Sequence, residues 1–288
     1  MSSLLLTNQV LTILSYILSI FGNFRYLIFG KKGPLDDEDP FHLGITPFTA
    51  NIFFIFIFWL CLYGVQLAYI IQLFYPDSRG TTSLTKITST STRLSVSQVV
   101  GWHFTSFNIL TFLWAFLFSK NHYILSELIV VINFFNILAL FAVHKTYKIQ
   151  RSDYFFLIHL PTSSIPLAWL FYLLFWNGAV MFHFHENLAA RILANIFIWN
   201  FLFVPVFVLV TIKDWSFGLA NSYLMFALGF GQLGIKVFAL QWIFAFIISA
   251  VLFFFSVVVA TGSTLANIGD GDEHVPGTNT ENAPLLPS

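Results

Sequence analysis

The strongest constraint on this chain is a series of long apolar runs whose centres contain none of its 13 Lys and Arg residues. Among its 13 acidic residues, only Glu127 falls inside such a run, close to the start. A charge at mid-bilayer costs at least about 2.5–3.5 kcal/mol, so runs that exclude charge suit lipid. Only 9% of the residues are charged, against about 25% in a soluble domain. The sequence therefore predicts an all-α, polytopic bundle of transmembrane helices.

A helix that crosses the hydrocarbon core needs about 20 mainly apolar residues. The candidate spans are residues 4–23, 47–74, 101–119, 123–143, 157–182, 190–212, 216–234 and 237–260. The first span and the last pair are the weakest, so we expect seven or eight crossings. No basic segment precedes the first run and no small-x-small cleavage site follows it, which favours a retained helix over a signal peptide.

These spans divide the chain into three predicted parts. Residues 1–46 hold the first transmembrane helix and an acidic loop, and residues 47–260 form the helix bundle. Residues 261–288 contain four acids, no Lys or Arg and no apolar run, so they cannot bury enough apolar surface to fold alone. We expect them to form a disordered tail.

The basic residues predict an orientation. Loops 75–100 and 144–153 carry three Lys or Arg residues each, whereas the loops after residues 119 and 182 carry one each. The positive-inside rule places the more basic loops in the cytosol, and with eight spans both termini join them. The loop after the first span opposes this assignment, because Arg25, Lys31 and Lys32 would face the lumen.

Small and neutral polar residues recur at helical spacing within the spans, as in Gly218 and Ser222. Such residues make helix interfaces in lipid, so bundle packing is the preferred interpretation. The alternative is a ligand cavity formed by the amides of Asn108, Asn133, Asn136, Asn177, Asn195 and Asn200. The deeper tryptophans could line an apolar pocket, with packing again preferred; they are Trp59, Trp169, Trp176 and Trp199.

Candidate chemistry is sparse. His183 and His185, beside Glu186, are weak zinc or copper ligands, because an i, i+2 pair lacks a third ligand and a solvated loop explains it more simply. His103 and His159 are single histidines at span ends, and we expect no acid near either of them, so neither resembles a catalytic base. No HExxH, GxSxG or phosphate-binding glycine loop is present. We predict no catalytic residue, no cofactor and a non-enzymatic role.

Charge also limits the partners and the transport mechanism. The net charge is zero, which argues against a nucleic-acid partner. Ion-coupled carriers usually keep ionisable residues inside their helices, and only Glu127 is available here, so a coupled pump is disfavoured. The predicted partners are the lipid bilayer and a hydrophobic small molecule.

From residue 10 to about residue 235 the order of features resembles the translocator-protein / tryptophan-rich sensory protein family. More narrowly, it resembles an extended eight-span branch and a fungal membrane family of unknown function. The segments that carry the likeness are Gly22-Asn23 and residues 45–64, 102–118, 159–177 and 213–231. The resemblance implies a central five-helix module that binds porphyrins or sterols. It also implies ligand contacts at Trp59, Tyr63, Asn108, Trp114, Trp169 and Asn177.

The tail ends in a sorting motif. Glu281 stands four residues before Leu285 and Leu286, which fits the acidic dileucine pattern read by clathrin-adaptor complexes. A solubilising tail without a signal is the alternative. If the motif acts, the protein resides in a vacuolar, lysosomal or endosomal membrane, with the endoplasmic reticulum or Golgi as the alternative.

Three functions fit these features. The leading hypothesis is an endomembrane protein that binds or moves a porphyrin, sterol or lipid without catalysis. The second is a membrane scaffold or trafficking protein that acts through its loops and tail. The third is a membrane metalloenzyme built around His183 and His185.

Overall fold

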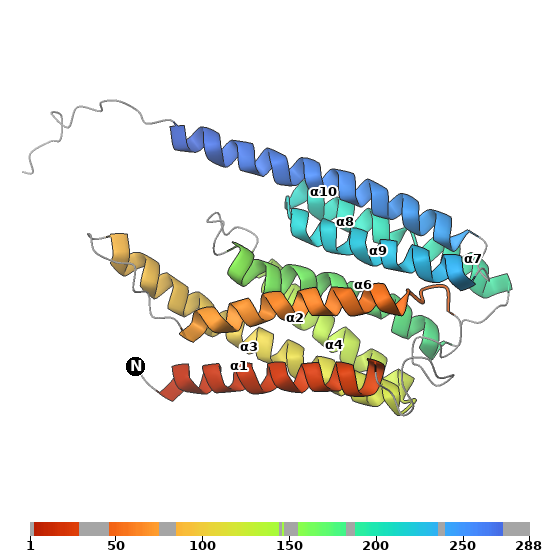
Figure 1. The fold of residues 1–288 in the computed structure, drawn as a ribbon, viewed down its shortest axis with the longest axis horizontal. Helices are drawn as coiled ribbons and strands as arrows, with labels where there is room; N and C mark the ends of the chain where they lie inside the picture. The colour runs from red at the N-terminus through yellow and green to blue at the C-terminus, as the bar shows by residue number, and fades with distance from the viewer. Residues whose placement is uncertain are drawn as a thin grey trace, which may run out of the picture.

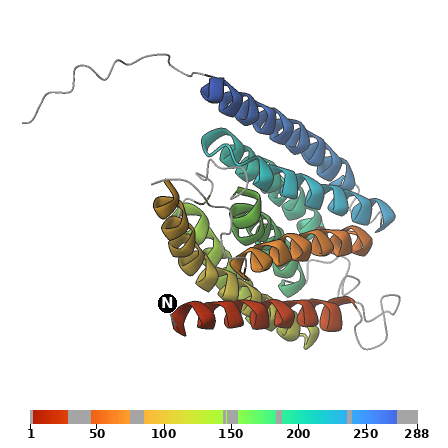
Figure 2. The same ribbon diagram turned by 60° about the vertical axis from the view of Figure 1, so that its left-hand side comes forward.

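A computed structural model shows the chain as a bundle of long helices (Figures 1 and 2). It describes residues 3–28, 46–74, 85–143, 146, 155–182, 188–235 and 240–272, and within these ranges all regular structure is helical. The all-α prediction is therefore confirmed. The helices are α1 (Ser3–Gly22), η1 (Asn23–Ile28), α2 (Ile52–Phe74), α3 (Thr85–Ser119), α4 (Tyr123–Ala142), η3 (Phe155–Ser164), α6 (Ile165–Met181), α7 (Leu188–Phe197), α8 (Asn200–Thr211), α9 (Trp215–Ile235) and α10 (Gln241–Asp272).

Every predicted span contains helix, but the span predicted over residues 47–74 becomes helical only at Ile52, and residues 198–199 divide the span predicted over 190–212 into α7 and α8. In the described part of the chain, six segments are long and apolar enough to cross a membrane. The two predicted spans beyond these six lie at α1 and α9. α9 carries buried Asn221, Ser222 and Gln232, as expected for a helix that faces protein rather than lipid. The chain is therefore a multi-pass membrane protein.

Two helices extend beyond their predicted limits. α3 begins at Thr85, inside the loop predicted over residues 75–100, and no Gly or Pro interrupts it before the apolar span. α10 runs to Asp272, past the predicted start of the tail at residue 261. The sorting motif of Glu281, Leu285 and Leu286 lies outside the described residues, as do His183 and His185.

The helices form layers around one central helix. Figure 1 and Figure 2 show α1 on one side of the bundle and α10 on the opposite side. In an 18-residue window of the stretch formed by η3 and α6, 72% of residues are buried, against 33% in such a window of α4, so this stretch is the axis of the bundle. The start of α1 and the end of α10 lie at the same end of the molecule (Figure 1), as an even number of crossings requires.

The segment before α2 is non-helical and buried, and α9 holds it. The Gln232 side chain donates to the carbonyl oxygens of Thr46 at 3.0 Å and Thr49 at 2.9 Å, while the Asn51 amide donates to the Ala227 carbonyl at 3.0 Å. Irregular backbone at membrane depth requires such internal partners. Gly231 permits this approach, because a Cβ there would lie 2.6 Å from the Thr49 carbonyl oxygen.

The π-helix η3 forms around Pro161, which lacks an amide proton and cannot continue an α-helical hydrogen-bond ladder. Glutamines of α2 bond to its backbone. Gln72 donates to the Leu157 carbonyl at 2.8 Å and Gln66 to the Pro161 carbonyl at 3.5 Å. The widened turn is therefore anchored to its neighbour, and it carries a row of buried polar side chains at residues 159 and 162–164.

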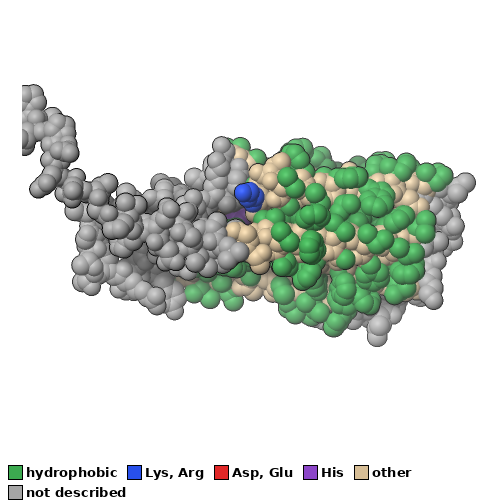
Figure 3. Space-filling view, turned by 90° about the horizontal axis from the view of Figure 1, so that it is seen from above, with side chains coloured by type: hydrophobic (Ala, Val, Ile, Leu, Met, Phe, Trp, Pro, Cys, Tyr) green, Lys and Arg blue, Asp and Glu red, His purple; other side chains and the backbone are tan. Residues whose placement is uncertain are grey.

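The outer surface is apolar. Figure 3 shows the face over α10, where hydrophobic side chains cover most of the described surface. Phe253, Phe254 and Phe255 on α10 and Phe203 and Phe207 on α8 are exposed. Such a surface is stable against lipid and unstable against water, which agrees with the membrane assignment.

Candidate functional site

Three of the predicted ligand-contact residues are tryptophans that contact one another. The rings of Trp59 and Trp169 meet edge to face with centroids 5.3 Å apart, and Trp114 lies 6.2 Å from Trp169 in the same manner. All three side chains are at most 1% exposed. Edge-to-face rings at these distances are well packed, so in this structure the indoles fill the centre of α2, α3 and α6.

Asn177 joins this cluster through hydrogen bonds. Its Oδ1 accepts from Trp114 Nε1 at 3.1 Å and from Ser126 Oγ at 2.9 Å, and its Nδ2 donates to Glu127 Oε2 at 2.6 Å. One amide of α6 thereby bonds to both α3 and α4. The Glu127 carboxylate therefore has a hydrogen-bond partner inside the bundle.

Tyr63 and Asn108 have other partners. The Tyr63 hydroxyl accepts from Asn23 Nδ2 at 2.5 Å and lies 3.0 Å from Ser19 Oγ, which ties α2 to α1. Asn108 Nδ2 donates to the carbonyl oxygen of Phe104, one turn earlier in α3. Four of the six predicted residues thus form one cluster, and ligand contact by any of them stays a prediction.

The six asparagines proposed as an alternative cavity are dispersed. Asn133 bonds to α3, Asn136 to His103, Asn195 to Gln241 and Asn200 to the last residue of α7. Within the described residues no two of the six share a hydrogen-bond partner. This arrangement supports the interpretation that they pack the bundle.

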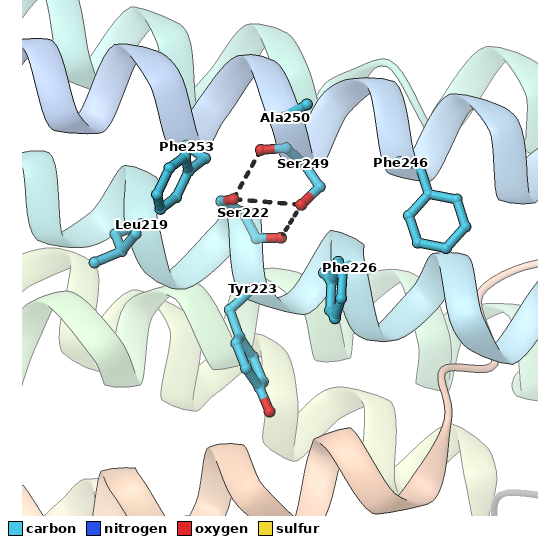
Figure 4. A pocket seen from close by; sticks show the side chains of 8 residues that line it. All are labelled: Leu219, Ser222, Tyr223, Phe226, Phe246, Ser249, Ala250 and Phe253. Carbon is cyan, nitrogen blue, oxygen red and sulfur yellow. Dashed lines mark hydrogen bonds between the residues drawn. The ribbon is translucent and has the colours of Figure 1, made fainter.

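A groove lies between α9 and α10. Its volume is about 650 Å³, within the range of roughly 300–1,000 Å³ for small-molecule sites. The lining residues, drawn in Figure 4, are Leu219, Ser222, Tyr223, Phe226, Phe246, Ser249, Ala250 and Phe253. Because Leu219, Phe226 and Phe253 are 36–55% exposed on the apolar surface, the groove is accessible from lipid. None of the six predicted contacts lines it.

Small residues on the helix seam create this groove. Ser222 Oγ donates to the Ser249 carbonyl and Ser249 Oγ donates to the Ser222 carbonyl, both at 2.8 Å (Figure 4). Gly229 lets the Phe246 ring lie against α9, since a Cβ there would be 2.8 Å from that ring. Close contact at small residues beside large rings leaves a hollow above the serine pair. The predicted packing role of Gly218 and Ser222 is confirmed, since a Cβ at Gly218 would meet Ser256 of α10.

The chemistry of the groove is apolar with a polar floor. Both serine protons are already donated, so the serine oxygens can only accept a further hydrogen bond. The Tyr223 hydroxyl donates to the Phe54 carbonyl at 3.0 Å. The eight lining residues include no charged side chain. The groove therefore suits a neutral hydrophobic ligand with at most one hydroxyl group near the serines.

A second polar feature overturns one sequence interpretation, because His159 does have an acidic partner. His159 Nε2 lies 3.0 Å from Asp214 Oδ2, and both side chains are fully buried. The two residues are 55 positions apart, on η3 and just before α9, so no local pattern reveals the pair. On the other side of the ring, Nδ1 lies 2.9 Å from Thr146 Oγ1.

Asp214 also caps α9. Its Oδ1 accepts from the backbone amides of Ser216 at 3.0 Å and Phe217 at 3.2 Å, and from the Ser216 hydroxyl at 2.6 Å. Burial alone would raise the pKa of the Asp214 carboxyl. The attraction of His159 and these hydrogen bonds outweigh burial and hold the pKa below its usual value. The Asp-x-Ser sequence before an apolar run is a capping signal that could have marked Asp214.

Comparisons with known proteins place the likeness in the C-terminal part of the chain. Residues 191–286 match the family described as fungal protein of unknown function (DUF1774). An uncharacterised protein of Schizosaccharomyces pombe is 36% identical over 73 residues, which cover 25% of this chain and 27% of that protein. The aligned part thus spans about a quarter of that relative's length. No solved structure matches the chain.

The matched region includes both the groove and the tail motif. It contains helices α8, α9 and α10 with every residue that lines the groove, and it extends over Glu281, Leu285 and Leu286. The predicted likeness to a fungal family of unknown function is confirmed for this region. The six residues of the predicted ligand set lie before it.

Proposed function

We propose that this multi-pass membrane protein binds a neutral hydrophobic small molecule in the groove between α9 and α10, without chemical change to the ligand. The groove itself is the observation that carries the proposal. It opens on the lipid-facing surface, it has aromatic and aliphatic walls, and its floor offers two serine oxygens as acceptors. A lipid-soluble ligand could enter it sideways from the bilayer.

The lining chemistry selects among porphyrin, sterol and lipid ligands. A porphyrin carries carboxylates, which need cationic or several donor groups when removed from water. The groove lining has neither. A sterol or a lipid acyl chain with a hydroxyl or ester near Ser222 and Ser249 fits the walls and the floor. The translocator-type site around Trp169 stays a proposal, supported by the tryptophan and asparagine cluster.

The decisive variant fills the groove without breaking the serine pair. Ala250 lines the groove and is exposed, so Ala250→Phe places a ring in the hollow. Val257→Phe adds a ring to the lipid-facing side of the same helix and is the matched control. Purified protein in lipid nanodiscs is titrated with a fluorescent sterol, a fluorescent phosphatidylcholine and a porphyrin. Binding is read by quenching of tryptophan, because Trp242 contacts Phe246 at the groove edge with ring centroids 6.4 Å apart.

We expect saturable binding of the sterol or the phosphatidylcholine, at least tenfold weaker in Ala250→Phe and unchanged in Val257→Phe. No saturable binding of any probe by the wild-type protein would overturn the proposal. Equal binding by Ala250→Phe and wild type would place the ligand elsewhere and would equally reject the groove.

A location in endosomal or vacuolar membranes is the companion proposal. The family match extends to residue 286, which includes the acidic dileucine motif. Adaptor capture would require Leu285 and Leu286, so replacing both with alanine in the tagged full-length protein should shift it to another membrane. An unchanged location would show that the motif is not a sorting signal. The scaffold or trafficking alternative would then lose its support from the sequence.

A further inference from the structure

Five buried side chains form one hydrogen-bonded chain at the end of the bundle where η3 begins. Thr146 Oγ1 lies 2.9 Å from His159 Nδ1, and His159 Nε2 lies 3.0 Å from Asp214 Oδ2. The Ser216 hydroxyl donates to Asp214 Oδ1 at 2.6 Å, and Ser164 Oγ lies 2.7 Å from Ser216 Oγ. All five are at most 3% exposed. Ionisable groups placed this way in a membrane protein are costly, and they usually serve function.

The partners of His159 allow its ring to carry either one proton or two. With two protons, Nε2 donates to Asp214 and Nδ1 donates to the Thr146 hydroxyl oxygen. With one proton, Nε2 still donates to Asp214, and Nδ1 accepts the rotated Thr146 hydroxyl proton. Neither state leaves a ring nitrogen unsatisfied, although an unsatisfied buried polar group would be penalised. Histidine is the residue type that changes charge near neutral pH.

Asp214 supplies the counter-charge. The same groups that hold its pKa low, the Ser216 hydroxyl and the amides at the start of α9, keep the carboxylate ionised without help from solvent. Phe141 and Phe155 flank the imidazole with ring centroids 5.8 Å and 4.9 Å away. Other described titratable groups on the adjoining elements make no hydrogen bond to His159: Cys61, Tyr63, Tyr69, His103, Tyr123, Glu127, Tyr172, Lys213 and Tyr223.

We propose that His159 is a proton-binding site and that its proton is linked to ligand binding in the α9–α10 groove. The linkage rests on the proposed function of the groove, whereas the proton site does not. Asp214 caps the first turn of α9, and the groove residues from Leu219 to Phe226 follow within the next turns of that helix. Loss of the proton leaves Asp214 buried beside a neutral ring, which weakens the tie between η3 and α9 and alters the groove wall.

The proton site is tested first, without ligand. Full-length protein carrying ¹⁵N-labelled histidine is titrated by NMR in lipid nanodiscs between about pH 5 and about pH 9. We expect one ring to show a charge change that is absent in His159→Gln and displaced in Thr146→Val. A His159 signal that keeps one charge state across this range overturns the proton site, as does an unshifted titration in Thr146→Val.

The linkage is tested with whichever sterol or phosphatidylcholine probe binds the wild-type protein. We expect its affinity to fall about fivefold or more from about pH 5.5 to about pH 8.5, a coupling of ordinary size. His159→Gln and Asp214→Asn should bind weakly at both values with no pH dependence. Asn retains helix-capping ability, so Asp214→Asn removes the charge while keeping the cap.

The matched control is Glu127→Gln, which neutralises another partly buried carboxylate that contacts neither His159 nor the groove. It should keep the pH dependence of the wild type. Binding that is equally strong at both pH values overturns the linkage while the proposed function stands. Absence of binding at every pH rejects the proposed function, and with it the linkage.

Discussion

The aromatic centre of α2, α3 and α6 and the seam between α9 and α10 hold neighbouring helices together in opposite ways. Around Trp169, large rings interlock and fill the space between helices. Along α9, glycines and serines let two helix backbones approach closely. The aromatic rings beside the seam are too large to pack as closely as the small residues do, so a hollow remains next to the seam. In this bundle, therefore, tryptophans mark the filled interior and small residues mark the seam beside which a hollow remains.

The largest expected effect breaks the aromatic centre. Trp169→Ala removes a fully buried indole and should lower the free energy of unfolding by about 3–5 kcal/mol. Phe253→Ala, at the 55%-exposed wall of the groove, should cost far less stability but weaken probe binding. Both are measured by denaturant unfolding in one detergent and by probe titration. Equal destabilisation by the two variants would contradict the contrast drawn between the regions.

The next effect concerns the junction of the two regions at His159 and Asp214. Asp214→Asn should destabilise the protein by about 3 kcal/mol at neutral pH, because it removes a buried carboxylate that accepts hydrogen bonds from Ser216 and the first amides of α9 and lies 3.0 Å from His159. The folded-state pKa of Asp214 is lowered, so its stabilisation is present above the ordinary carboxyl pKa of about 4 and is lost as pH falls below it. Unfolding followed against pH should show the wild type approaching the variant under acid. A constant difference down to about pH 2 would refute this origin.

A smaller effect tests the second junction, where α9 holds the segment before α2. Gly231→Ala should cost about 1–3 kcal/mol, since the new methyl group meets backbone atoms of residues 49–51 that cannot move aside. Gly64→Ala is the matched control, because its Cβ meets no atom within 4 Å, and a helical alanine should be neutral or stabilising. The measurement is the melting temperature of each variant in thermal unfolding. Similar melting temperatures would show that the close approach is unimportant.

The smallest effect lies within the seam. Ser222→Ala and Ser249→Ala should each destabilise the protein by about 0.6 kcal/mol, the average for hydrogen bonds between membrane helices. The two losses should add, because each hydroxyl donates to a backbone carbonyl that the other substitution leaves in place. The single variants should leave the groove open and reduce binding of a hydroxylated sterol more than binding of a saturated acyl chain. Identical losses for both ligands would mean that the serine oxygens do not contact the ligand.

Prediction from sequence succeeded where the signal is local. Helices lie over all eight apolar runs, and the small-xxx-small pair of Gly218 and Ser222 lies at a helix interface as expected. Prediction failed for the partner of His159, because the acid lies 55 residues away. The groove was also missed, although the spacing of the small residues on α9 was visible. That spacing predicts close contact between helices. It does not predict which aromatic rings lie beside the contact, and those rings form the walls of the groove.

The sequence by itself determined that this chain consists of membrane-spanning helices, because the free energy of placing a residue in lipid depends mainly on that residue and its near neighbours. It also determined that few charges would be buried. Only the tertiary structure decided which of those charges meet, which tryptophans interlock and where a hollow remains. These outcomes depend on how each helix is rotated and placed against the others, and residues far apart in the chain establish that arrangement together.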